Sequence, residues 1–111
     1  MNNKELLELA AKAVNQPIEF TDGVPVSFIE NGVVFAAWNP LTDDGAALRL
    51  AVKLNMQITI EDERCGCVTV AWGDEFNKYV AELSQNSDTA TAATRRAIVR
   101  AAAEIGKTIT P

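Results

Sequence analysis

Asp43 and Asp44 lie side by side in WNPLTDDG, the segment whose residue types come closest to those of a ligand site. A carboxylate pair could bind Mg²⁺ or Ca²⁺, but a calcium loop spaces its oxygen ligands along alternate positions and ends in a glutamate. Here no acidic residue follows until Glu61. Carboxylates in the first turn of a helix are stabilised by its free N–H groups and its dipole. We therefore expect Thr42 to cap a helix that has both aspartates in its first turn, and no metal.

Cys65 and Cys67 form a C-G-C pair, the second candidate for metal chemistry. On a strand the two thiols would share a face and could supply half of a zinc site. The chain has no histidine and no third cysteine, so only a dimer could supply the four ligands of a closed site. The spacing also differs from the C-x-x-C of redox proteins. We expect two partly buried thiols and no cofactor.

The absence of histidine also limits catalysis. A general base would have to be a carboxylate, lysine, tyrosine or cysteine with a shifted pKa, which a sequence does not reveal. The chain contains no nucleophile elbow, no P-loop and no dinucleotide-binding fingerprint. We therefore expect no catalytic residue and no enzymatic activity.

Three arginines near the C-terminus, Arg95, Arg96 and Arg100, form the best candidate for a binding surface. Arg96 and Arg100 lie one helical turn apart, so they could meet phosphates or an acidic partner together. The same residues could instead form a solvated face that pairs with the acidic remainder of the chain. Trp72 is added to this candidate surface because tryptophan is enriched at binding hot spots. Trp38 is expected to close an edge of the core.

The charge of the chain is acidic and unevenly distributed. The 111 residues carry a formal net charge of −5, with 48% hydrophobic and 23% charged residues, as in an ordinary globular domain. The segment 88–107 carries four basic and two acidic residues, whereas the rest carries six basic and thirteen acidic. An acidic body repels phosphate backbones at long range, so nucleic-acid binding is disfavoured except through the basic segment.

The chain gives no sign of a membrane or secretory protein. No apolar run approaches the roughly 18 residues that a membrane span needs. The N-terminus, MNNKELLELAAKAV, lacks the basic start and apolar block of a secretory signal. The length of 111 residues predicts a single domain, 1–111. With only two cysteines and no such signal, we expect a reducing cytoplasm.

Apolar periodicity predicts the elements that position these residues. Helical spacing predicts helices at about 3–14, 42–54 and 88–105, with a loose tail at about 107–111. Asn2 or Asn3 would cap the first helix, Ser87 or Asp88 would cap the third, and Gly106 would close it.

Alternating residues and turn signals predict strands between the helices. The strands are expected at 18–20, 26–29, 33–37, 56–60 and 66–72, with a loop and a short strand near 78–83. Asn31-Gly32 and the segment 61–66 would form hairpin turns. The order predicts an α+β domain in which an antiparallel-rich sheet is covered by helices.

Two segments carry a family resemblance: WNPLTDDGAALRLAVKL at 38–54 and ATRRAIVRAAAEIG at 93–106. They resemble small phage and prophage proteins with the phage ABA-sandwich domain, in which a Trp-Asn-Pro segment with aspartates precedes a helix. The resemblance covers about a third of the chain. It implies a layered α/β/α-type sandwich and a phage or prophage origin, hence the cytoplasm of a bacterial host. It implies no catalytic residue.

These observations together favour a small accessory protein that binds a host or phage protein without catalysis. Two alternatives stay open: nucleic-acid binding through the basic C-terminal helix, and an acidic surface that mimics DNA and inhibits a host protein. The alanine-rich last helix could also pack on a second subunit, so a homo-oligomer stays open as well.

Overall fold

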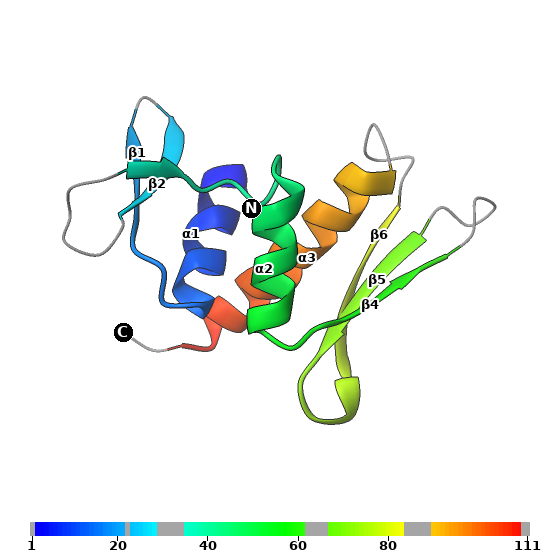
Figure 1. Ribbon diagram of the computed structural model, residues 1–111. Coiled ribbons are helices and arrows are strands. Elements are labelled where there is room, and N and C mark those ends of the chain that lie inside the picture. The colour runs from blue at the N-terminus through cyan, green and yellow to red at the C-terminus, as the bar shows by residue number, and fades with distance from the viewer. Residues whose placement is uncertain (1, 22, 29–34, 62–66, 84–89, 110–111) are drawn as a thin grey trace.

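A computed structural model describes residues 2–21, 23–28, 35–61, 67–83 and 90–109 of the chain, and Figure 1 shows their arrangement. These residues form three α-helices, one short 3₁₀ helix and six strands. The fold class is α+β, as predicted. The elements are α1 (Asn3–Ala13), β1 (Ile18–Thr21), β2 (Val24–Phe28), β3 (Phe35–Ala37), α2 (Asp44–Lys53), β4 (Gln57–Ile60), β5 (Cys67–Trp72), η1 (Asp74–Phe76), β6 (Lys78–Leu83) and α3 (Ala90–Lys107).

The strands form two antiparallel sheets, whereas the sequence pattern predicted one. β1, β2 and β3 make one sheet, and β4, β5 and β6 make the other. The helices lie between them, with β1 beside α1 and the second sheet against α3 (Figure 1). Strands pair most readily with their neighbours in the chain. After β3 the chain turns at the fully buried Pro40 and enters α2, so β4 starts a new sheet beyond the helices.

Helix α3 is the centre of the core. Its alanines let neighbouring elements approach closely, and Ala93, Ala97 and Ala101 have no exposed surface. Val68 and Val70 of β5 pack on α3 from the sheet side, and these two side chains are at most 1% exposed. On its other side α3 packs against α1. The small residues of α3 therefore serve helix–helix and helix–sheet contact at once.

Gly106 does not close α3, contrary to the sequence expectation. The helix continues to Lys107, and Gly106 is buried against the backbone of α1. A Cβ atom at this position would lie 2.0 Å from the carbonyl oxygen of Leu9. Glycine is therefore required here for close approach of two helices and not for a left-handed turn.

The other boundaries follow the predicted patterns closely. Asn2 caps α1, since its side-chain oxygen accepts the N–H of Glu5 at 2.8 Å. Thr21 pairs with Val24, and Gly23 has a φ of +80°, which glycine adopts without strain. The predicted loop and strand after Trp72 are present as η1 and β6. The predicted turns at 31–32 and 61–66 and the predicted caps at 87–88 lie outside the described residues, except for the first residue of 61–66.

The described residues include no helix with the length and hydropathy to cross a bilayer.

Candidate functional site

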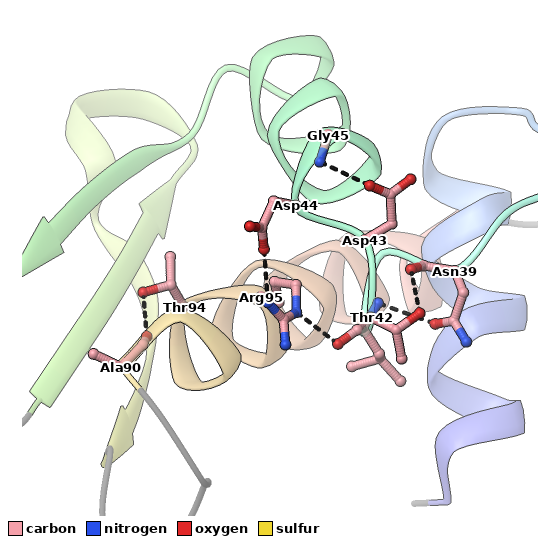
Figure 2. Close-up of polar contacts among 9 residues, drawn as sticks. Asn39, Thr42, Asp43, Asp44, Gly45, Ala90, Thr94 and Arg95 are labelled. Atoms are coloured by element: carbon pink, nitrogen blue, oxygen red, sulfur yellow. Dashed lines mark hydrogen bonds and ion pairs between the residues drawn. The ribbon is translucent and has the colours of Figure 1, made fainter.

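The segment from Trp38 to Gly45 is a corner built by Asn39. The Asn39 side chain accepts the N–H of Leu41 at 3.1 Å, which forms an Asx turn. Its backbone carbonyl accepts the N–H groups of Thr42 and Asp43 at 3.0 and 2.9 Å. The side chains that looked most like a ligand site therefore hold a turn between β3 and α2 (Figure 2).

Asp43 is the N-cap of α2, and Thr42 is not. The Asp43 carboxylate accepts the N–H of Gly45 at 3.0 Å, whereas the Thr42 hydroxyl donates to the carbonyl of Asn39. Asp44 is the first residue of the helix, as Figure 2 shows. The expectation of a first-turn acid is confirmed for Asp44. The cap lies one residue later than expected because both the N–H and the hydroxyl of Thr42 bond to the carbonyl of Asn39. Among the residues described, no group of three or more potential metal ligands lies together.

Arg95 joins α3 to this corner. Its Nε donates to the carbonyl of Leu41 at 2.8 Å, and one terminal nitrogen lies 2.6 Å from the Asp44 carboxylate (Figure 2). Only 20% of the Arg95 side chain is exposed. The guanidinium thus already has a carboxylate and a carbonyl as partners, which leaves little of it for an outside anion.

Arg96 and Arg100 meet at Glu82 of β6. Arg100 lies 2.6 Å from one carboxylate oxygen of Glu82, and Arg96 lies 3.7 Å from the other. Glu82 is the one charged residue among the described positions that is classed as buried, at 8% exposure. Because a buried carboxylate needs a partner, this triad fixes α3 on the second sheet.

Sequence reasoning did not single out Glu82, although two signals pointed to it. It occupies the same face of its strand as Val80, which packs against the core. Arg96 and Arg100 also lie one turn apart, so a single acidic side chain can pair with both. The observed ion pairs therefore favour the interpretation of the three arginines as a charge-paired face over their interpretation as a free basic surface.

Trp72 does not share a surface with Arg100. It pairs with Lys78 at one end of β5 and β6, whereas Glu82 pairs with Val68 four residues away. Four strand residues span about 13 Å. Trp72 is half-buried and packs against the core, as does Trp38. The four residues predicted as one binding surface thus have contacts in three places: Arg95 at the corner before α2, Arg96 and Arg100 at Glu82, and Trp72 at the far end of β5.

Cys67 is a free, half-buried thiol on the face of β5 that points away from α3. Cys65 lies outside the described residues.

An apolar groove between α2, α3 and β4 was not predicted. Its volume is about 300 Å³. The walls come from three elements, which contribute Ala47, Leu48, Ile58, Ile60, Thr94 and Ile98. Periodicity marked each of these elements separately, but only the tertiary structure brings their apolar side chains to one opening.

Large aliphatic side chains stand exposed at the mouth of this groove. Leu48 is 60% exposed and Ile60 is 63% exposed. Val52, one helical turn after Leu48, is 71% exposed. Contiguous exposed apolar surface beside a hollow is typical of interaction sites.

A second hollow, between α1 and β1, is less suited to binding. Its volume is about 470 Å³ and Asn3, Lys4 and Thr42 are among its lining residues. The Lys4 ammonium lies 5.5 Å from the centre of the Phe20 ring, a cation–π contact within the hollow itself. We therefore take the α2–α3–β4 groove as the candidate site.

The chain matches no family model, no curated protein and no solved structure. The functional argument therefore starts from the groove and its surroundings.

Proposed function

We propose that this protein is a small accessory protein that acts by binding another protein through the α2–α3–β4 groove, without catalysis. The observation that carries the proposal is the exposure of Leu48 and Ile60 at one hollow, with Val52 exposed one helical turn beyond Leu48. A folded domain gains nothing for its own stability by presenting three large aliphatic groups to water.

The energy available at this site is sufficient for specific recognition. Full burial of a leucine, valine or isoleucine side chain contributes roughly 1.5–3 kcal/mol. Since the three side chains retain 60–71% exposure, covering them would contribute about 1–2 kcal/mol each. A few such anchors account for most of the binding energy at many interfaces.

The same proposal extends to a phage or prophage origin and to the cytoplasm of a bacterial host. Its support is the resemblance of segments 38–54 and 93–106 to phage ABA-sandwich proteins. The partner would then be a host or phage protein.

The test is capture from a bacterial lysate with matched variants. The groove variant combines Leu48→Ser and Val52→Ser, and the control combines Val24→Ser and Tyr79→Ser. Val24 and Tyr79 are 50% and 67% exposed and lie away from the groove, so both pairs remove exposed apolar groups.

We expect wild type and the control to capture the same partner and the groove variant to lose it. Equal capture by all three proteins would refute the assignment of the groove. Circular dichroism on both variants checks that the fold is kept.

A further inference from the structure

The hydrogen-bond pattern of β4 shows which of its backbone groups point toward β5 and which point away from it. The N–H of Glu61 donates to the carbonyl of Cys67 at 2.8 Å. In an antiparallel pair, hydrogen-bonded and non-hydrogen-bonded positions alternate. Gln57 and Thr59 therefore bond to β5, whereas the N–H and C=O groups of Ile58 and Ile60 point away from it.

Strand β4 is at the edge of its sheet. Among the residues that the structure describes, no strand pairs with its outer side. The side chains of Ile58 and Ile60 also line the groove. The same two residues thus present free backbone groups at the edge and aliphatic side chains in the hollow.

The opposite edge of this sheet, strand β6, is contacted by a charged side chain of α3. By the same alternation, the carbonyl of Ala81 points outward from β6, and Arg100 donates to it at 2.8 Å. A charged side chain at an edge strand discourages further pairing. An arginine of α3 therefore contacts one edge, whereas no described residue pairs with the other edge, which lies beside an apolar groove.

The charges around the open edge indicate the sign of the partner. Asp44 and Arg95 both line the groove and are paired with each other at 2.6 Å. The exposed Glu61, which follows Ile60 directly, therefore leaves a net negative charge beside the edge. The basic residues of α2, Arg49 and Lys53, line a different hollow, beside Trp38. A second copy of this chain, with its net charge of −5, would bring like charges together at this edge.

We propose that the groove accepts an extended segment of the partner protein, which adds to β4 as a further antiparallel or parallel strand. The segment carries aliphatic residues at alternate positions, which enter the hollow, and a lysine or arginine beside them, which meets Glu61. Strand addition to an open edge derives affinity from backbone hydrogen bonds and specificity from alternate side chains. This inference rests on the proposed function and names the form of its ligand.

A proline at position 60 tests the backbone part of the proposal. Ile60→Pro removes an N–H that points away from β5, so the β4–β5 hydrogen bonds are kept. Ile60→Thr is the matched control, because it shortens the same side chain and retains the N–H. The probe is the acetylated and amidated peptide KVTVTVK, with EVTVTVE as the charge-reversed peptide.

We expect KVTVTVK to bind the wild type and to slow amide exchange at Ile58 and Ile60 by about tenfold or more. Ile60→Pro should weaken its binding by about tenfold relative to Ile60→Thr, since it loses one hydrogen bond and blocks pairing. EVTVTVE should bind more weakly than KVTVTVK.

Three results would overturn the inference: no protection of Ile58 and Ile60 at millimolar peptide, equal binding by the two Ile60 variants, or a dimer with both amides protected in the absence of peptide. If one of these results is obtained but the Leu48/Val52 variant still fails to capture the partner from lysate, the inference is refuted and the proposed function is retained. Equal lysate capture by that variant would instead remove the proposed function.

Discussion

Replacing Gly106 with alanine tests the packing of α1 against α3 on which the core depends. The added Cβ would lie 2.0 Å from the carbonyl oxygen of Leu9 and 2.8 Å from its carbonyl carbon. Both are backbone atoms, so no side chain can rotate away. To restore an ordinary contact of 3.4 Å, the two helices must move apart by about 1.4 Å.

The expected cost follows from that displacement. A gap of 0.5–1 Å already forfeits about a quarter to a half of the dispersion energy between packed atoms. Overpacking a well-packed core costs about 1–3 kcal/mol, and occasionally more. Because backbone meets backbone here, we take about 3 kcal/mol. Alanine returns about 1 kcal/mol through its higher helix propensity, so the net loss is about 2 kcal/mol.

The matched control is the same substitution in another helix. At Gly45 of α2 an added Cβ would lie 3.1 Å from the Arg49 guanidinium nitrogen, the far end of a flexible side chain. Gly45→Ala should therefore be neutral or stabilise the fold by up to about 1 kcal/mol.

Urea unfolding and thermal melts measure both variants. At about 4 °C per kcal/mol for a domain of this size, Gly106→Ala should lower Tm by about 8 °C, whereas Gly45→Ala should leave it unchanged or raise it. A Gly106→Ala protein as stable as the wild type would show that α1 and α3 do not approach so closely, and the account of the core would be wrong.

Two further predictions concern polar contacts of α2 and α3. Asp43→Ala removes the N-cap that accepts the Gly45 N–H and should cost about 1 kcal/mol in urea unfolding; the cap assignment fails if Thr42→Ala costs as much. Glu82→Gln leaves Arg96 and Arg100 without their carboxylate. Since both arginines are 38% exposed and regain water, we expect a loss of about 2 kcal/mol, below the range for a fully buried pair. A loss under about 0.5 kcal/mol would place the triad among ordinary surface ion pairs.

Local patterns in the sequence predicted the elements well. The helical spacing of Leu6 and Ala10 and the alternation of Val68 and Val70 predict burial on one face, which the structure confirms. Such patterns depend only on near neighbours in the chain. The boundaries of α1 and α2 and the C-terminal end of α3 therefore fell within two residues of those expected.

Tertiary relationships were not available from local pattern. A glycine near a helix end is usually a C-cap, and only the position of Leu9 shows that Gly106 serves close packing. The arginines of α3 looked like one basic surface because their partners, Asp44 and Glu82, are distant in sequence. The groove was missed for the same reason, since its walls come from three separate segments.

Site-specific photocrosslinking in living bacterial cells shows directly whether the groove binds a partner. A photoreactive phenylalanine derivative replaces Leu48 at the mouth of the groove, and in a second protein it replaces Tyr79 on the outer face of β6. Both side chains are well exposed, at 60% and 67%. If the groove binds a partner, position 48 gives a discrete crosslinked product that position 79 does not. Crosslinking at position 79 alone, or equally at both positions, would contradict the assignment of the binding site to the groove.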